Sequence, residues 1–468
     1  MISLFLPLAH GLLVGRQDLP IPTWLFAWGA SVVLIVSFVA LSVAWRDSKF
    51  SSDRWRPAPE RLSRVLTGRA AEIVAGAIGV FLLGAVVYTG LDGTDQPNLN
   101  FAVTFVFVTF WLGMVVLSIL LGDVFRAFNP WRAIGRTAGA AFRLIAGQSH
   151  SEPLRYPERL GRWPAAAGIV GFAWLELVYE TSGLGAVGLQ PATLAAATLV
   201  YTAYTLVAMT LFGVETWLRR GEAFSVYFGM FSKLAPLEVR DGRLGVRRPL
   251  AAATRWAKEI PGSIALVVAT IAVTTFDGAQ EGLWQQPIRD LFDRLTDLGL
   301  GPTAAFRTSE SIFFALTLAG VAAIYWAGVR GMRTVRGSPD LRSLGRSFAH
   351  TLIPIGVAYL TAHYFSLVVF AEQAQFTYLL SDPLGDGSDL FGTASSGIDY
   401  GLLNANTIWY VQVAALVTGH VVALMLAHDR AITVYGDPDR ASRSQRWMLL
   451  VMVAFTCLGL FLLSQANA

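Results

Sequence analysis

Long apolar runs alternate with short polar segments along the whole chain. An α-helix rises about 1.5 Å per residue, so an apolar run of about 20 residues spans the roughly 30 Å hydrocarbon core of a bilayer. About ten runs reach that length. They lie at about 22–45, 71–91, 100–122, 164–183, 190–218, 261–277, 309–328, 349–372, 406–427 and 446–465. The pattern predicts an all-α, polytopic transmembrane helix bundle, with residues 1–468 forming a single integral-membrane domain.

Composition agrees with this class and excludes several others. The 468 residues are 54% hydrophobic and 15% charged, with a mean hydropathy of +0.52, which leaves too little polar surface for a soluble globule. The single cysteine, Cys457, excludes an intrachain disulfide, a cysteine-based zinc site and an iron–sulfur cluster. The sequence also contains no phosphate-binding glycine loop, serine nucleophile elbow or HExxH motif.

Basic residues fall almost wholly in alternate loops between the predicted spans. The segments 46–70, 123–163, 219–260, 328–348 and 428–446 hold 32 of the 36 Lys and Arg residues. The positive-inside rule places these loops in the cytoplasm, so we expect both termini outside and a multi-pass protein of the cell (plasma) membrane.

The longer loops differ in character on the two predicted sides. The cytoplasmic loops 123–163 and 219–260 interleave Arg and Lys with Phe, Trp and Leu, which favours amphipathic segments lying on anionic lipid headgroups. No nucleic-acid-binding module accompanies them. The sequence does not identify a protein partner. Of the outer loops, 278–308 fits an amphipathic helix, and 373–405 is rich in Gly, Ser and Asp, as in a solvated lid.

Ionisable residues inside the spans are the main candidates for function, because placing them in hydrocarbon is costly. Counted from the predicted cytoplasmic ends, Glu176, Glu180, Asp277 and His363 lie at about 18, 24, 24 and 21 Å, in one layer of the outer half of the membrane. Tyr179 and Tyr364 adjoin this layer, and Glu310 and Glu372 are placed to line its entrance. Such a layer can hold a divalent metal such as copper or zinc, bind a small cationic group or relay protons.

His10 is a possible further ligand at the outer surface. If a peptidase removed the first nine residues, the amine and ring of His10 would chelate copper together. The alternative is an ordinary surface histidine.

A second group, His350 and His420, lies nearer the cytoplasmic side. Haem b needs two axial histidines that face each other from different helices. His350 and His363 are thirteen residues apart and so lie on nearly opposite helix faces, whereas His420 lies about 12 Å below His363. Haem is therefore less favoured than a metal ion, and we expect His428 at a cytoplasmic helix end.

Several stretches resemble a family of multi-pass membrane proteins, mainly actinobacterial, whose members often carry the label fenitrothion hydrolase. They are AHGLLVGRQDLPIPTWLFAWGASVVLIVSFVALSVAW, NPWR, RGEAFSVYFGMFSKLAPL, TTFDG and SFAHTLIPIGVAYLTAHYFS. The label implies organophosphate hydrolysis. A metal-dependent phosphotriesterase needs a metal-activated water. We expect the histidine and carboxylate layer to bind that metal.

Two function classes follow, with a third as the alternative to both. The first is a carrier or metal-handling protein, favoured because the histidine and carboxylate residues share one depth. Pro354 and Gly356 also interrupt the predicted helix between His350 and His363, as in many transport sites. The second is an enzyme that hydrolyses an ester or passes electrons as a haem or quinone redox subunit. The third is an accessory subunit whose buried polar residues only fix helix contacts.

Overall fold

The computed structural model describes residues 23–51, 54–146, 153–179, 189–256, 260–280 and 282–466. Helices occupy all ten predicted positions. In the described part of the chain, nine helices are long and apolar enough to cross a membrane, and the helical stretch 163–179 is shorter. The architecture is thus that of an all-α membrane bundle. His10 and Glu180 lie outside the described residues.

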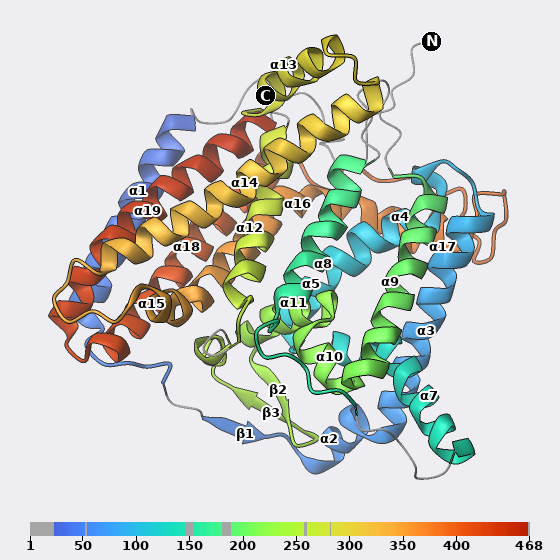
Figure 1. The fold of residues 1–468 in the computed structure, drawn as a ribbon, viewed down its shortest axis with the longest axis horizontal. Coiled ribbons are helices and arrows are strands. Elements are labelled where there is room, and N and C mark those ends of the chain that lie inside the picture. The colour runs from blue at the N-terminus through green and yellow to red at the C-terminus, as the bar shows by residue number, and fades with distance from the viewer. Residues whose placement is uncertain are drawn as a thin grey trace.

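The long helices form two groups that lie side by side (Figure 1). One group packs α1 beside the last helices of the chain. Its members are α1 (Thr23–Ala44), α14 (Pro302–Met332), α18 (Ala405–Tyr435) and α19 (Pro438–Ala466). The other group contains α3 (Arg69–Asp92), α4 (Phe101–Thr104), η2 (Phe105–Gly113), α5 (Met114–Leu121), α8 (Trp163–Trp174), η3 (Leu175–Tyr179) and α9 (Pro191–Phe212).

Two helices, α12 (Ser263–Gln280) and α16 (Ile353–Phe376), connect the groups. Helix α12 packs against α8 on one side and α14 on the other, while α16 packs against η2 and α18. Nearly every residue of α12 from Leu266 to Ala279 is buried. The polar side chains of α12, Asp277 among them, are therefore enclosed by protein at the interface between the two groups.

The segment 219–260 differs from the expectation of a surface-lying amphipathic loop. Its helix α11 (Ala223–Phe231) is buried almost throughout and packs under α8. Glu222 caps this helix by accepting hydrogen bonds from the backbone N–H groups of Phe224 and Ser225, at 3.0 and 2.7 Å. The aromatic residues of α11 enter the protein core because neighbouring helices, rather than lipid, cover both of its faces.

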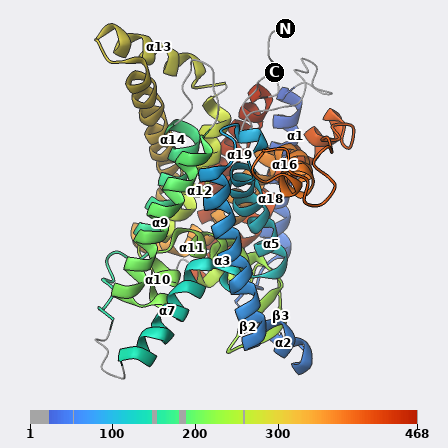
Figure 2. The ribbon, with the colours of Figure 1, turned by 90° about the vertical axis from the view of Figure 1, so that its right-hand side faces the viewer.

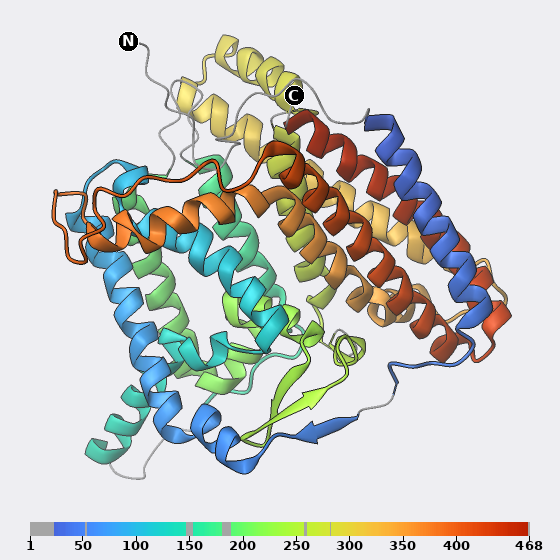
Figure 3. The same ribbon diagram turned by 180° about the vertical axis from the view of Figure 1, so that it is seen from behind.

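A three-stranded antiparallel sheet, which the sequence pattern did not predict, covers the same end of the bundle (Figure 3). Strand β3 (Arg243–Arg247) lies between β1 (Trp55–Pro57) and β2 (Leu237–Arg240). Trp55 pairs with Arg247, so the segment after α1 is tied to a hairpin almost two hundred residues later. We call this end of the molecule the sheet end.

The opposite end carries α13 (Gln285–Asp297), an amphipathic helix that packs against α14, as the sequence suggests (Figure 2). We call it the α13 end. The segment 373–405 also lies there and includes α17 (Tyr378–Ser381). Hydrogen bonds attach it to the chain before α4, including Thr94 N–H to Leu384 O at 2.7 Å.

Short elements complete the chain. The remaining α-helices are α2 (Glu60–Thr67), α6 (Phe125–Phe128), α7 (Pro130–Ala146), α10 (Val214–Arg220) and α15 (Leu341–Phe348). The 3₁₀ segments are η1 (Pro97–Leu99), η4 (Ser232–Leu234), η5 (Ala253–Arg255) and η6 (Ala349–Leu352). The predicted run 190–218 is divided at Gly213, whose φ of +83° ends α9 before α10 begins.

Candidate functional site

Asp277 of α12 and the neighbouring residues His363 and Tyr364 of α16 form a buried polar cluster at the interface of the two helix groups. His363 Nε2 lies 2.8 Å from Asp277 Oδ2, and the Tyr364 hydroxyl donates to the same oxygen at 2.6 Å. The Asp277 side chain is fully buried, whereas that of His363 is 16% exposed. The equal depths counted along the sequence therefore correspond to direct contact for Asp277 and His363.

Glu176 approaches this cluster from the other helix group. It lies close enough to Asp277 for the two carboxyl groups to interact electrostatically, and its Oε2 is buried without a hydrogen-bond partner in the described structure. The predicted layer thus brings Glu176, Asp277 and His363 together.

Two aromatic residues that sequence reasoning missed complete the floor of the site. Trp111 donates its indole N–H to the Tyr227 hydroxyl at 2.9 Å, and its ring centre lies 6.1 Å from that of Tyr364. Tyr227 belongs to α11, the element we expected at the headgroups. Its burial is a consequence of tertiary packing, and only the unusual density of aromatics in RGEAFSVYFGMF hinted at it.

Two of the elements that border the site are π-helical. Glu176 lies in η3 and Trp111 in η2, where the hydrogen-bond pattern is wider than in an α-helix. Segments of this kind are uncommon and are found frequently at functional sites, because they turn side chains away from the direction that an α-helix would give them. Periodicity in the sequence cannot reveal them.

The second ring nitrogen of His363 faces a small cavity. A Cβ added at Gly278 would lie 3.5 Å from His363 Nδ1. This nitrogen therefore lies beside the backbone of α12 at Gly278. The cavity beside it has a volume of about 20 Å³ and is also lined by Thr274 and Tyr359. This is enough for one water molecule.

Polar residues continue from the cluster toward the α13 end. Gln280, three residues after Asp277, donates its side-chain amide to Glu310 Oε2 at 2.9 Å and to the Leu177 carbonyl at 3.2 Å. Arg307 donates to the Tyr179 carbonyl at 2.7 Å and its guanidinium lies 4.0 Å from the centre of that ring. Glu310 and Tyr179, predicted near the entrance and the layer, therefore lie in one polar path above Asp277.

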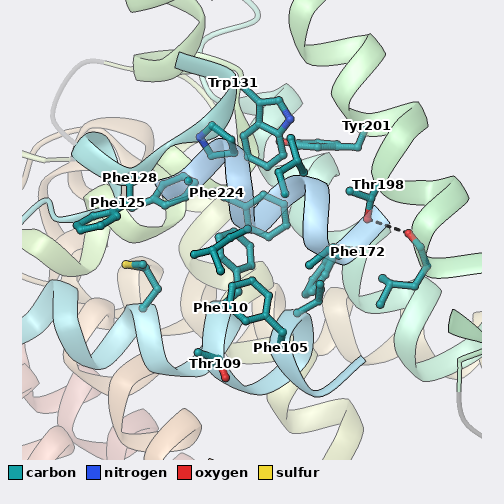
Figure 4. Close-up of a pocket in the computed structure, with 18 of the residues that line it drawn as sticks. Phe105, Thr109, Phe110, Phe125, Phe128, Trp131, Phe172, Thr198, Tyr201 and Phe224 are labelled. Carbon is teal, nitrogen blue, oxygen red and sulfur yellow. Dashed lines mark hydrogen bonds between the residues drawn. The ribbon is translucent and has the colours of Figure 1, made fainter. Parts of the chain in front are cut away.

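Glu372, the other predicted entrance residue, lies elsewhere. It accepts a hydrogen bond from Thr109 at 2.9 Å. Thr109 lines an apolar cavity of about 540 Å³ in which the rings of Phe110, Phe172 and Phe224 gather (Figure 4). This cavity is larger than the one beside His363, but its lining has almost no polar chemistry.

The lower histidines are separate from the cluster. His350 lies in η6, the 3₁₀ turn before α16, and is buried. His420 is buried in α18 and contacts the Leu416 carbonyl through Nδ1 at 2.7 Å. Pro354 lies in the first turn of α16, so the break in this helix lies at its beginning. His428, expected at a helix end, is buried in α18, with Nε2 3.1 Å from the Trp45 carbonyl.

The described ranges contain no group of three or more His, Cys, Asp or Glu side chains arranged to hold a metal ion. Asp277 and His363 supply two donor atoms that suit a metal ion. However, the Tyr364 hydroxyl already donates a hydrogen bond to Asp277 Oδ2, the oxygen that His363 contacts. Glu180 and His10, two further ligands proposed from the sequence besides Glu176, lie outside these ranges. As arranged, the cluster suits a proton or a hydrogen-bonding cation better than a closed metal site.

Comparison with known proteins adds no relative: no family model matches this chain, and no match is found among curated proteins or solved structures.

Proposed function

We propose that this protein is a membrane carrier for a small cation, in which the Asp277–His363 pair holds the cargo or the proton exchanged for it. The 2.8 Å contact between His363 Nε2 and Asp277 Oδ2, enclosed by apolar helices, is the observation that carries the proposal. An ionisable pair at such a place is costly for folding, and its common use in membrane proteins is to move protons or ions.

The location of the pair supports a carrier. Asp277 and His363 belong to the two helices that connect the helix groups, and Glu176 reaches them from one of these groups. Relative motion of two helix groups around a fixed central site is a common mechanism of alternating access. A rearrangement at this interface would bring Glu176 and Asp277 into new positions relative to each other.

The polar path through Gln280 and Glu310 supports entry from the α13 end. The basic loops gather at the sheet end, so the positive-inside rule makes the α13 end the outer side of a plasma membrane. Cations that fit the donors of the pair are a proton, an ammonium-type group and, once Tyr364 moves, a divalent ion such as zinc or copper.

Reconstituted vesicles with an internal pH-sensitive or metal-sensitive dye test this proposal. Purified protein should move protons or a cation from a panel of ammonium, methylammonium, zinc and copper, and Asp277→Asn and His363→Ala should abolish the movement. Asp290→Asn, on exposed α13, is the matched control and should leave it unchanged. Equal transport by the wild type and both site variants would contradict the proposal, as would the absence of any movement.

Hydrolysis of an ester is the second candidate, supported by a different feature of the same pair. If Asp277 accepts the Nε2 proton, His363 Nδ1 is an unprotonated base facing a water-sized cavity, which is the arrangement of an oriented general base. The family resemblance suggests a phosphotriester as substrate. Loss of phosphotriester turnover in His363→Gln would support this candidate. Turnover that persists in that variant would exclude the Asp277–His363 pair as the catalytic site.

The redox alternative has a direct optical test. A haem-containing preparation of the full chain would show a Soret absorption band, which His350→Ala or His420→Ala would remove. We do not favour this alternative, because the cavity that His420 lines has a volume of about 40 Å³, which is far too small for a haem.

A further inference from the structure

A polar cavity of about 120 Å³ lies at the sheet end, and its lining residues are distinct from those of the Asp277 cluster. It is enclosed by α6, α10 and α11 together with the segments around Arg162, Lys233 and Trp256. Four cationic side chains and two carboxylates line it. They are Arg126, Arg162, Arg219 and Lys233, and Asp123 and Glu215. The cavity therefore has more positive than negative charge.

One of the two carboxylates is already neutralised. Glu215 forms ion pairs with Arg126, Arg132 and Arg136 at 3.0, 3.1 and 2.9 Å. Burial raises the pKa of Glu215, but these three guanidinium groups together outweigh burial and lower its pKa. The other carboxylate, Asp123, is exposed at the rim. Among the described residues, neither carboxylate forms an ion pair with the other two cations, Arg162 and Lys233.

Arg162 is the first of these two cations and is only 8% exposed. Its Nη1 donates to two neutral acceptors, the Trp256 carbonyl and the Ser263 hydroxyl, each at 2.9 Å, and its guanidinium stacks over the Trp256 ring. Its Nε is buried and has no hydrogen-bond partner among the described residues. Burial, assisted by Arg220, lowers the pKa of Arg162 to about 10.

Lys233 is the second cation. In the described structure its ammonium group makes neither a hydrogen bond nor an ion pair. Burial lowers the pKa of Lys233, and the nearby Asp123 offsets this only in part. Two cations that share a cavity and are only partly neutralised are unfavourable, and an anion placed between them would relieve both.

We propose that this cavity binds a phosphate-class oxyanion, with Arg162 and Lys233 as its principal ligands. Arg162 Nε would donate one hydrogen bond and Lys233 up to three. Ser225 can add another, because its Oγ accepts from Asn129 Nδ2 at 2.9 Å and so keeps its own hydrogen for donation. The volume exceeds several-fold the roughly 10–15 Å³ that one water needs, so it admits a tetrahedral oxyanion. Inorganic phosphate and the phosphate of a lipid headgroup offer the same chemistry.

Lysine acylation of the wild-type full chain tests the proposal without a mutation. The sequence has only three lysines, Lys49, Lys233 and Lys258, so a mass spectrum resolves each one. Millimolar sodium phosphate should slow the acylation of Lys233 at least fivefold relative to sodium chloride of equal ionic strength. Acylation of Lys49, which lies over the Trp45 ring away from the cavity, should not change and serves as the internal control.

A variant pair provides the binding measurement. In detergent, titration calorimetry should give a Kd for phosphate that Lys233→Gln weakens at least tenfold. Arg333→Gln removes an exposed positive charge at the same end of the molecule and should leave the Kd unchanged. Equal weakening by both substitutions would show a general charge effect and overturn the proposal.

Lipid nanodiscs separate the two sources of phosphate. If a lipid headgroup is the ligand, phosphatidylglycerol discs should protect Lys233 from acylation and phosphatidylcholine discs of the same size should not, while free phosphate has no effect. If free phosphate is the ligand, it should protect Lys233 equally in both discs. The proposal fails if Lys233 reacts at one rate under all these conditions.

Discussion

One carboxylate oxygen, Asp277 Oδ2, contacts both His363 and Tyr364, which are consecutive residues of α16. Consecutive residues of a helix point about 100° apart, so two of them reach one atom only when that atom lies between their directions. Asp277 occupies this position because α12 packs directly against α16. The contact therefore connects the chemistry of the site to the packing of these two helices.

Removing the Tyr364 hydroxyl should weaken this connection. We expect Tyr364→Phe to lower stability by about 1 kcal/mol, the usual contribution of a hydrogen bond between helices in a membrane protein. The midpoint of thermal unfolding in detergent measures the change. Tyr410→Phe, at an exposed tyrosine of α18, is the control. Equal midpoints for the two variants would show that the hydroxyl contributes nothing.

The Asp277 contact should also determine which nitrogen of His363 carries the proton. A carboxylate that accepts from Nε2–H leaves Nδ1 unprotonated, so ¹⁵N spectra of histidine-labelled protein should show the Nε2–H tautomer for His363. His363→Gln identifies its signal by removing it. In Asp277→Asn the tautomer preference should decrease, and a spectrum unchanged by that substitution would contradict the assignment.

Glu222 should be more important to stability than an ordinary helix cap. It is fully buried, and besides capping α11 it accepts the Tyr201 hydroxyl at 2.5 Å. Glu222→Ala removes the cap and leaves that buried hydroxyl without this acceptor, so we expect a loss of about 2–3 kcal/mol. Asp340→Ala removes the exposed cap of α15 and should lower stability by about 1 kcal/mol. Thermal unfolding compares the two, and equal losses would mean that Glu222 is only a cap.

Acid should weaken the sheet end through Glu215. Burial raises the pKa of Glu215, but Arg132, Arg126 and Arg136 together lower it below its value in the unfolded chain. A carboxyl group of this kind contributes its full stabilisation above its unfolded pKa, and the contribution is lost as the pH falls through the folded pKa. Stability measured between pH 6 and pH 3 should therefore fall less steeply in Glu215→Gln than in the wild type. Glu158→Gln, at an exposed residue, should follow the wild-type curve.

Close packing of α18 on α16 should require glycine at position 419. A Cβ there would lie 2.3 Å from Ala358 Cβ and 2.8 Å from the Pro354 carbonyl, so the two helices would have to separate. Gly419→Ala should lower the unfolding midpoint and also reduce any activity of the site, since α16 carries His363. A Cβ at Gly320 of α14 meets nothing within 4 Å, so Gly320→Ala should be neutral. Identical behaviour of the two variants would contradict the packing argument.

The helices and part of the site follow from local features of the sequence. An apolar run of fixed rise per residue determines where a helix lies and how deep each of its residues sits. Depth alone predicted that Glu176, Asp277 and His363 share a layer, and the structure brings these three together. The same count grouped Glu372 with Glu310 at one entrance. Depth does not tell which neighbour a helix face meets, and in the structure Glu372 contacts Thr109 whereas Glu310 contacts Gln280.

Other features depend on contacts between distant segments. Basic and aromatic residues of 219–260 are compatible with a headgroup surface, yet α11 is buried and places Tyr227 under the site. The sheet pairs Trp55 with Arg247, and no short-range pattern in the sequence predicts such a pairing. Burial of His428 likewise depends on Trp45, nearly four hundred residues earlier in the chain.

By itself, the sequence determined the all-α class and the positions of the long apolar helices, because these depend on hydrophobicity and on the rise of a helix. Only the tertiary structure decided that Asp277 contacts His363 and Tyr364, that π-helical turns present Glu176 and Trp111, and that Arg162 and Lys233 share a cavity. Those relationships depend on how helices rotate and cross against one another, and the packing of side chains from the whole chain determines that arrangement.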